Sequence, residues 1–442
     1  MANYKKAALL TEGKTKKIWE VAGDESLVIV ENKPDITAFD RPEFTKQFKS
    51  KAVYATETTC RVFELLKQAN IPVAYVGQIS PTEFVAQKCS MIPLEAVARR
   101  YAVGSYLKRN PNLERPKGEL PIRFHKLIIE FFLKTTKGAL RINDNVIVEG
   151  LNPEKGEEDP FIPNPYDITW DLMHSKKPFW DSTAKLRDGI STSQILETQE
   201  RQIIAIKDLE EYLRETFLVL EGMWATFGHR LIDLKIEFGV ADEGIFVADV
   251  IDNDSWRLRD QNWRELSKEA FRQGEEISEV EQKYGIVSEL IGKFHIPQQC
   301  LVLWRGSDKD VFPEFSQSLN LKSIDLEEIT ASGHKSPQKC LDVLEDLLRK
   351  YPNGGVIVAK VGMSNGLAPM LAARTSWPVI SIPATLNENP EDAWSSLRMP
   401  SSVPMAVIFS EGNATSFALK ILAQKNPLLY QQLQKKIEEL DK

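Results

Sequence analysis

The sequence of 442 residues contains few cysteines and histidines, four and five respectively, and it has no long hydrophobic run. The cysteines at 60, 89, 300 and 340 are scattered without a CxxC pair, which favours reduced thiols in the cytosol over disulfides. No apolar stretch approaches the roughly 20 residues of a membrane-spanning helix, and the first residues lack the apolar core of a signal peptide. We therefore expect a cytoplasmic protein with no membrane partner.

An excess of one charge is also lacking. The 56 basic and 63 acidic residues give a formal net charge of −7, which argues against a nucleic-acid partner but leaves room for local basic pockets. A hydrophobic fraction of 42% and an aromatic fraction of 9% are sufficient for real cores. A chain of this length has room for two or three domains.

The first part of the chain mixes strand and helix patterns, and we predict an α+β domain over residues 1–295. A long helix is predicted over 193–227, a strand hairpin over 231–250, and mostly helical structure over 263–294. Residues 145–190 are rich in Pro, Asn, Asp and Gly and predict a long irregular excursion that carries local structure. Further strands are expected at 7–10, 17–21, 26–31, 73–76 and 84–88, a helix at 52–69, and a short helix or extended segment at 92–101.

The pattern changes near residues 295–298, after which short apolar strands alternate with helical segments. This alternation predicts an α/β domain with a doubly wound parallel sheet over residues 299–442. The expected strands cover 299–304, 355–361, 377–382 and 405–409, and the expected helices cover 338–349, 367–373 and 415–424.

Three acids crowd into six positions at Asp249, Asp252 and Asp254. Such crowding repels itself unless a cation neutralises it, so the segment indicates a metal and phosphate site. Glu237 lies on the adjacent strand of the predicted hairpin, so Glu237 and Asp249 could hold a magnesium ion, which prefers carboxylate, water and phosphate oxygens. A structural ladder of ion pairs is the alternative, because Asp233, Lys235 and Glu237 share one strand face.

Two basic segments could meet anionic ligands. A glycine turn at 13–17 carries three lysines; Lys14 and Lys16 are expected to share a strand face, and the alternative is a solvated hairpin turn. Residues 99–109 form a basic run interrupted by Gly104-Ser105, where small residues let a substrate approach and arginine suits phosphate or carboxylate. A solvated basic face is the alternative there.

In the second part, three turns carry polar side chains, and those at 306–310 and 362–369 follow predicted strands, where doubly wound sheets bind their ligands. They carry Ser307 with Asp310, Ser332 with His334 and Lys335, and Ser364 with Asn365. A histidine between small residues and a lysine is a candidate proton shuttle, and a surface histidine is the alternative. Asn365 could simply cap a helix.

Over about 1–294 the chain resembles the phosphoribosylaminoimidazole-succinocarboxamide synthase (SAICAR synthetase) family. The segments that carry this resemblance occur in the family's order, at 12–16, 91–95, 99–109, 235–239 and 249–258. The resemblance implies an ATP-grasp-like fold and ATP-dependent amide formation, in which carboxyaminoimidazole ribonucleotide is activated as an acyl phosphate and attacked by L-aspartate. It implies ATP contacts from Gly13, Lys14, Thr15, Lys16, Met91 and Glu95. Lys235 and Asp249 would be catalytic, Glu237 and Asp249 would hold Mg²⁺, and Arg99, Ser105, Asp254 and Arg257 would bind the ribonucleotide. Glu158-Asp159 is a weaker match to a family acidic motif.

The three turns of the second part, with 377–381 and 392–400, resemble the phosphoribosylaminoimidazole carboxylase family over about 299–430. The fused order resembles the bifunctional family of animals. It implies carboxylation of aminoimidazole ribonucleotide with CO2, without biotin, and a homo-octamer with a flavodoxin-like carboxylase fold. His334 would move the C4 proton. Substrate contacts are implied for Ser307, Asp310, Ser332, Lys335, Ser364 and Asn365.

The sequence departs from the two family patterns at 39–44, 55–57, 309 and 363. These departures leave an alternative open, in which the chain is a diverged paralogue that acts as an oligomeric scaffold or regulator with one or both sites inactive. The hypothesis of an active enzyme is favoured by the presence of the lysines at 14 and 16, the acids at 237 and 249, and His334.

Overall fold

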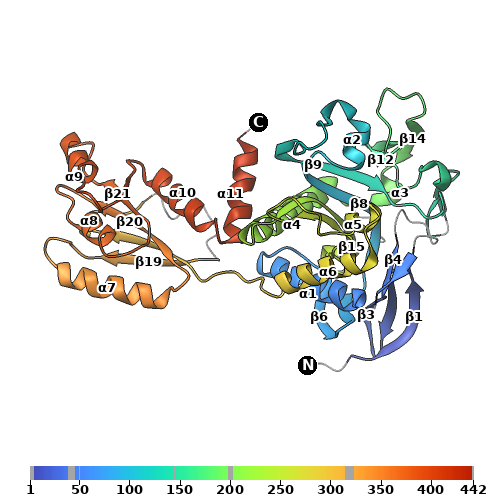
Figure 1. Ribbon diagram of the computed structural model, residues 1–442, viewed down its shortest axis with the longest axis horizontal. Helices are drawn as coiled ribbons and strands as arrows, with labels where there is room; N and C mark the ends of the chain where they lie inside the picture. The colour runs from blue at the N-terminus through green and yellow to red at the C-terminus, as the bar shows by residue number, and fades with distance from the viewer. Residues whose placement is uncertain are drawn as a thin grey trace. The chain divides into compact units, whose positions relative to one another are not determined.

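The computed structural model describes residues 4–37, 45–48, 50–143, 145–197, 203–313 and 323–440. Its contacts divide the chain into two compact units, Met1–Phe294 and His295–Lys442 (Figure 1). Within the described ranges, no helix is both long and apolar enough to traverse a bilayer. The sequence departure at 39–44 lies outside the described residues.

The first unit begins with a five-stranded antiparallel sheet that α1 (Lys51–Gln68) packs against. A short turn joins its first two strands, and the amide of Gly13 closes this turn on the carbonyl of Lys16 at 2.9 Å. The predicted strands are present, but Lys14 lies in the turn and not on a strand, so the expectation that it shares a strand face with Lys16 is wrong. In sheet order the strands are β1 (Lys6–Glu12), β2 (Lys16–Val21), β3 (Asp24–Asn32), β7 (Glu83–Gln87) and β6 (Tyr75–Ser80).

The second sheet of this unit has eight strands, and its centre is formed by β9, β8 and β15. The segment at 92–101 is extended, because it pairs with a strand on each side. Side chains alternate between the two faces: one face packs on α4 (Ile206–Thr226), and the other carries charged side chains. The strands are β14 (Lys185–Ser191), β13 (Thr169–Met173), β12 (Phe161–Ile162), β9 (Arg123–Leu133), β8 (Ser90–Tyr101), β15 (Arg230–Ala241) and β16 (Gly244–Ala248), with β17 (Trp256–Arg259) paired to β15.

Two predictions for this unit need correction. The single long helix over 193–227 is wrong: α3 (Ser193–Leu196) and α4 are separate, and Glu197 bridges Ile203 as in a sheet. β-branched isoleucines at 203 and 204 favour such extended backbone. The excursion at 145–190 carries local structure as predicted, but it is less irregular overall, because β12, β13 and β14 extend the second sheet.

The remaining short elements of the first unit connect or flank the sheets. The predicted helical region at 263–294 is confirmed in part, with extended or irregular backbone before and between its two helices. These elements are β4 (Asp35–Thr37), β5 (Thr45–Gln47), α2 (Ser105–Arg109), β10 (Leu140–Ile142), β11 (Asn145–Val148), α5 (Glu269–Arg272) and α6 (Ile277–Ile291).

The second unit contains a five-stranded sheet in which every described pairing is parallel, as predicted. Its core lies on both faces: in β18, Val302 and Trp304 face one cluster, while Leu301 and Leu303 face the other. Apolar side chains on both faces explain the continuous hydrophobic run of this strand. In sheet order the strands are β19 (Asp325–Thr330), β18 (Cys300–Arg305), β20 (Gly355–Val361), β21 (Val379–Pro383) and β22 (Ala406–Val407).

Helices cover the two faces of this sheet. α7 (Pro337–Lys350) and α8 (Leu367–Ala372) contribute to one core cluster, and α10 (Glu411–Leu422) and α11 (Pro427–Glu439) contribute to the other. The short α9 (Trp394–Leu397) precedes β22. The sequence patterns missed β19, because this edge strand is acidic and largely exposed and therefore lacks the apolar signature of its neighbours.

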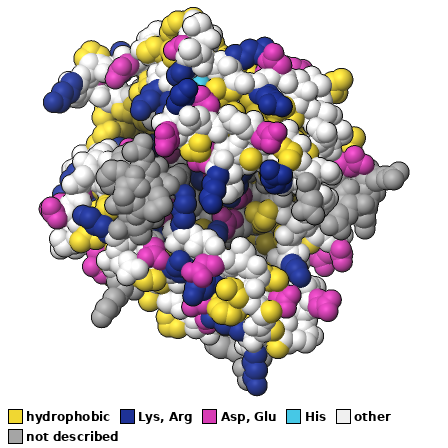
Figure 2. Space-filling model, turned by 90° about the vertical axis from the view of Figure 1, so that its right-hand side faces the viewer, with side chains coloured by type: hydrophobic (Ala, Val, Ile, Leu, Met, Phe, Trp, Pro, Cys, Tyr) yellow, Lys and Arg dark blue, Asp and Glu magenta, His cyan; other side chains and the backbone are white. Residues whose placement is uncertain are grey.

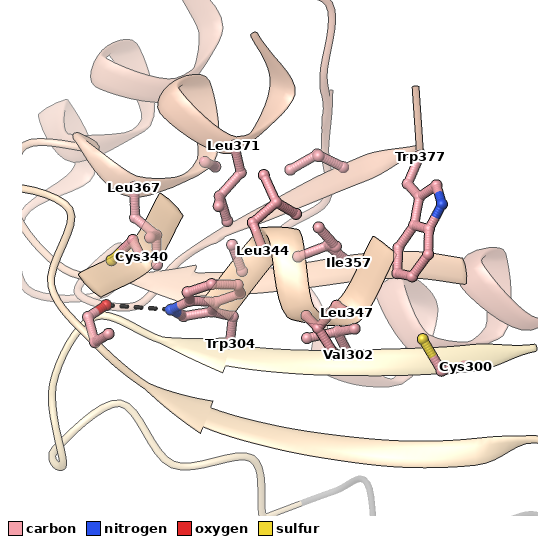
Figure 3. Close-up of a cluster of buried hydrophobic side chains, with 14 of the residues drawn as sticks. Cys300, Val302, Trp304, Cys340, Leu344, Leu347, Ile357, Leu367, Leu371 and Trp377 are labelled. Carbon is pink, nitrogen blue, oxygen red and sulfur yellow. Dashed lines mark hydrogen bonds between the residues drawn. The ribbon is translucent and has the colours of Figure 1, made fainter. Parts of the chain in front are cut away.

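Trp304 lies at the centre of the first cluster of the second unit (Figure 3). Its ring is fully buried, and its Nε1–H donates to the carbonyl of Ala331 at 3.2 Å. We expect Trp304→Phe to lower the free energy of unfolding by about 1–3 kcal/mol, because the buried carbonyl loses its donor. Calorimetry of thermal unfolding would measure this. Trp394→Phe is the matched control, since Trp394 is 62% exposed, and an equal effect of both substitutions would contradict the explanation.

Candidate active sites

Lysines and carboxylates alternate around the middle of β15 and the end of β16 in the first unit. Lys16, at the start of β2, forms an ion pair with Asp249, and Lys134 forms one with Glu237. Glu237 pairs in register with Ala248, so Asp249 follows directly after the strand neighbouring Glu237. Figure 2 shows basic and acidic side chains gathered around a hollow on one face of the molecule.

The opposite charges of this cluster shift one another's pKa values, and for Glu237 and Lys235 the shift favours the charged form. Burial raises the pKa of Glu237, but Lys134 and Lys235 outweigh this effect and hold the pKa below its usual range. Burial lowers the pKa of Lys16 to about 8, although Glu237 acts in the opposite direction. Burial also lowers the pKa of Lys235, but the carboxylates of Glu95 and Glu237 raise it above its usual value. Lys235 therefore stays charged at neutral pH, and Glu237 stays ionised.

Asp249 adopts a backbone conformation with φ of +64°, which few residues other than glycine accept. Aspartate and asparagine are the residues that tolerate it best, because their short polar side chains bond locally. Backbone strain of this kind is concentrated at functional sites. Asp249 is the one acid of the crowded segment that adopts this conformation.

Of the other two acids of that segment, Asp254 is neutralised by the protein itself, whereas burial and the neighbouring Asp254 raise the pKa of Asp252. The carboxylate of Asp254 accepts from Lys268 at 2.9 Å, lies 3.4 Å from Lys51, and also accepts from the Tyr284 hydroxyl. Burial raises the pKa of Asp254, but Lys268 and Lys51 outweigh it and hold the pKa well below its usual range. The buried Asp252 accepts the amide of Asp254 at 2.8 Å. The crowding is thus relieved at Asp254 by two lysines.

Met91 and Glu95 lie on β8 beside this cluster. Glu95 pairs in register with Glu237 and accepts from Lys235 at 2.5 Å. Met91 is 45% exposed and lies opposite Gly239. A Cβ at position 239 would lie 2.5 Å from the Cβ of Cys89 and 3.3 Å from the Met91 sulfur, so glycine is required there.

A second group of charges lies at the other end of the same sheet face. One oxygen of Asp233 accepts from Arg99 at 2.6 Å and from Arg257 at 2.5 Å. The other terminal nitrogen of Arg99, Nη2, donates to the hydroxyl of Ser105 at 3.0 Å. Arg99 is only 3% exposed, so Ser105 and the partly exposed Arg257 are the members of this group that a ligand can reach.

Gly104 lets the chain pass close to Arg257. Its φ is +60°, and a Cβ there would lie 2.8 Å from Nη2 of Arg257. We expect Gly104→Ala to lower the free energy of unfolding by about 1–3 kcal/mol, the usual cost of a strained backbone conformation. Calorimetry would measure the loss. Gly77→Ala is the control, because a Cβ there meets nothing within 4 Å, and equal losses would contradict this explanation.

No group of three or more His, Cys, Asp or Glu side chains among the described residues could hold a metal by itself. The donor chemistry of Glu237 and Asp249 nevertheless suits magnesium, which is commonly bound by one or two carboxylates together with substrate phosphates. The carboxylates of Glu158 and Asp159 accept hydrogen bonds from backbone amides, those of Gly138 at 3.2 Å and Thr135 at 2.9 Å respectively. Asp159 also helps to raise the pKa of Lys235, so it lies near the charged cluster as well.

Sequence patterns missed several partners of the predicted residues. Each is a single charged residue far along the chain from the side chain that it contacts, so no local spacing could have identified it. The missed residues are Lys51, Glu130, Lys134 and Lys268.

In the second unit, two of the three predicted turns meet beyond β18 and β20. The hydroxyl of Ser307 donates to Asp310 at 2.8 Å. A Cβ at Gly362 would lie 3.7 Å from the other oxygen of Asp310, so the turn after β20 lies close to this pair. Met363 in that turn has a φ of +55° and is 75% exposed.

The turn that carries His334 packs against the same region. A Cβ at Gly366 would lie 2.4 Å from Nε2 of His334, so only glycine lets the imidazole lie against this backbone. His334 and Lys335 are exposed, and Ser332 accepts the amide of Lys335 at 3.3 Å. The structure therefore brings His334 to the turn that contains Ser364 and Asn365.

Asn365 has a structural role. Its amide nitrogen donates to Ser381 at 2.8 Å and to Ser396 at 2.9 Å, and its oxygen accepts the amide of Ala368 at 3.1 Å. The residue is only 7% exposed. Asn365 thus fixes the start of α8 and the loop before it, as the capping alternative predicts, and leaves Ser364 exposed beside it.

Comparison with family models assigns each unit to a class. Residues 9–156 and 177–288 match SAICAR synthetase, and residues 301–442 match AIR carboxylase. The chain therefore joins a SAICAR synthetase unit to an AIR carboxylase unit.

Curated relatives share both units in the same order. The bifunctional phosphoribosylaminoimidazole carboxylase/phosphoribosylaminoimidazole succinocarboxamide synthetase of Rattus norvegicus is 31% identical over 96% of this chain and 92% of its own length. Its Homo sapiens counterpart is 30% identical over 97% and 93%, and a probable multifunctional protein of Caenorhabditis elegans is 32% identical over 96% and 91%. The chain belongs to this family of bifunctional enzymes of purine biosynthesis.

Solved structures similar to this chain include a SAICAR synthetase in complex with ADP. It is 27% identical, with a TM-score of 0.46, over 64% of this chain and 97% of its own. A SAICAR synthetase from Pyrococcus horikoshii OT3 is 26% identical, with a TM-score of 0.45, over 63% and 98%.

Proposed function

We propose that the second unit carboxylates aminoimidazole ribonucleotide with CO2 and that the first unit ligates the carboxylated product to L-aspartate, using ATP, to give SAICAR. The observation that carries the ligase proposal is the cluster of three lysines and three carboxylates on β2, β8, β15 and the ends of β9 and β16. A phosphoryl group in transfer carries charge on three oxygens, and fixed cations at that position stabilise it.

The ligation requires activation because a carboxylate is a poor electrophile. ATP transfers its terminal phosphoryl group to the imidazole carboxylate, and the aspartate amine then displaces phosphate from the acyl phosphate. Lys16 and Lys235 would offset the charge on the transferring group, with Gly13, Lys14 and Thr15 of the turn over the ATP phosphates. Met91 and Glu95 would border the nucleoside. Magnesium held by Glu237 and Asp249 would supply further positive charge to the phosphates.

The ribonucleotide would be held at the opposite end of the sheet face. Ser105 and Arg257 would bind its phosphate or carboxylate directly, and Arg99 would act through Ser105, because all three of its guanidinium nitrogens have partners in the protein. Asp254 would position the segment between Asp249 and Arg257 through its two lysine partners.

In the carboxylase unit, C4 of the aminoimidazole would attack CO2 and then lose its proton. His334 would accept that proton, since its imidazole lies at the junction of two substrate turns. Ser307, Asp310, Ser332 and Ser364 would orient the substrate, and Lys335 would neutralise its phosphate. Asn365 would hold the Ser364 turn in place.

The finer structural and biological assignments are also proposals. The strands of the second unit lie in the order β19-β18-β20-β21-β22, so the second strand along the chain lies at the edge beside the first. This is the order of flavodoxin-like sheets, which bind ligands at the carboxyl ends of the strands. We propose this class for residues 299–442, an ATP-grasp-like class for residues 1–295, a homo-octamer built by the carboxylase unit, and a cytoplasmic location. The carboxylase step would use neither biotin nor ATP.

Release of ADP tests the ligase proposal. With carboxyaminoimidazole ribonucleotide, L-aspartate, ATP and magnesium, the protein should release ADP and form SAICAR in equal amounts. Omission of any one component, or chelation of magnesium, should stop both. ADP release that continues without the ribonucleotide would contradict the proposal, because it would indicate a different acceptor.

A further inference from the structure

We propose that Arg109 and Phe161, acting through Arg99, position Ser105 and Arg257, the proposed ribonucleotide-binding residues of the first unit, and that the segment at 157–176 serves this purpose. The proposal rests on the proposed ligase function. The SAICAR synthetase family model matches residues on either side of this segment but not the segment itself. The structure shows what the segment contacts.

The guanidinium of Arg109 connects this segment to the charged face of the sheet. It donates to Glu130 on β9 and to the carbonyl of Ser175, and it lies over the Phe161 ring at 4.3 Å and over the Phe132 ring at 5.4 Å. The Arg109 side chain is only 1% exposed. The two rings pack on each other with their centroids 5.5 Å apart, and the buried guanidinium lies against both of them. The rings attract its charge and restrict its orientation.

Glu130 transmits this orientation to Arg99. One carboxylate oxygen accepts from Arg109, and the other accepts from Nε of Arg99 at 2.5 Å. Arg99 in turn contacts Asp233 at 2.6 Å and Ser105 at 3.0 Å. Acids and arginines therefore alternate without interruption from the segment at 157–176 to the hydroxyl that would bind the ribonucleotide.

The chain of contacts continues to Arg257, because Asp233 accepts from Arg99 and Arg257 through the same oxygen. Removing one member of a buried network leaves its neighbours with an unpaired charge, so the remaining side chains shift to recover partners. A displaced Arg99 would release both Ser105 and Asp233. Phe161 and Arg109 are thus positioning residues that need not touch the substrate.

The proposal predicts a selective effect on the ribonucleotide. Phe161→Leu keeps an apolar side chain but removes the ring, and we expect it to raise the KM for carboxyaminoimidazole ribonucleotide roughly three- to tenfold, in line with a buried cation–π contact. The KM values for ATP and L-aspartate, and kcat, should change less than about twofold, as expected when ground-state binding is lost. Arg109→Lys, which keeps the charge but not the planar fork, should act in the same direction.

Two further variants make the test decisive. Phe161→Tyr keeps the ring and should retain the wild-type KM. Ile168→Ala, at an 83% exposed position of the same segment, should also be neutral. A Phe161→Leu variant that resembles Ile168→Ala, or one that changes all KM values and kcat together, would overturn the proposal. Wild-type protein is assayed first: if it forms no SAICAR, the proposed function fails, whereas active wild type with a non-selective variant rejects only the positioning role.

Discussion

Asp249→Asn is expected to reduce ATP-dependent ligation more than about a hundredfold, the scale seen when one fixed electrostatic partner of a transition state is lost. The substitution removes the charge that pairs with Lys16 and that would hold magnesium. Carboxylation should be unchanged, because the contacts of the carboxylase turns come from the second unit. The measurement is the rate of each half-reaction, with its own ribonucleotide supplied.

Asparagine is the informative replacement at this position. It accepts the φ of +64° better than alanine, so a loss of activity would report the charge and not the backbone. Asp242→Asn is the matched control, since Asp242 is exposed in the turn of the same hairpin. Ligation that survives Asp249→Asn within a factor of two or three would exclude Asp249 as a metal ligand.

His334→Ala is expected to have the opposite pattern. Carboxylation should fall by about 10²- to 10⁴-fold, the usual contribution of a positioned acid–base group, and ligation should be retained. The reason is the position of the imidazole, which lies against Gly366 where two of the carboxylase turns meet. The rate of carboxylation is measured from aminoimidazole ribonucleotide and bicarbonate, and the rate of ligation from the carboxylated product.

Lys339→Ala is a suitable control for this variant, because Lys339 is exposed on α7 a few residues further along the chain. Loss of both activities in His334→Ala, or in Asp249→Asn, would refute the independence of the two sites. Carboxylation that is unaffected by His334→Ala would show that His334 is a surface histidine without a catalytic role, which is the alternative interpretation of the sequence.

Sequence patterns predicted the elements whose signal is local. β18 and β20 are apolar on both faces, and their short apolar runs predict them directly. The segment 92–101 stayed ambiguous because its pairing with β9 and β15 is not local, and the acidic edge strand β19 was missed. The predicted long helix over 193–227 failed because periodicity continued across residues that form a bridge instead.

The candidate sites show the same division. Motif order located Lys16, Glu237 and Asp249, and the structure brings Lys16 and Asp249 together and places Glu237 on the neighbouring strand. The sequence did not reveal that Asp254 forms ion pairs with two lysines or that Arg99 forms ion pairs with buried carboxylates. Those contacts join residues more than a hundred positions apart or lie on different elements, so only the fold reveals them.

One assay tests the bifunctional assignment against the alternative of an inactive scaffold. The protein is supplied with aminoimidazole ribonucleotide, bicarbonate, ATP, magnesium and L-aspartate, and products are identified by mass. We predict that the carboxylated ribonucleotide forms and is converted to SAICAR. Carboxylated product alone would place a defect in the first unit, and the absence of both products would contradict the assignment as an enzyme.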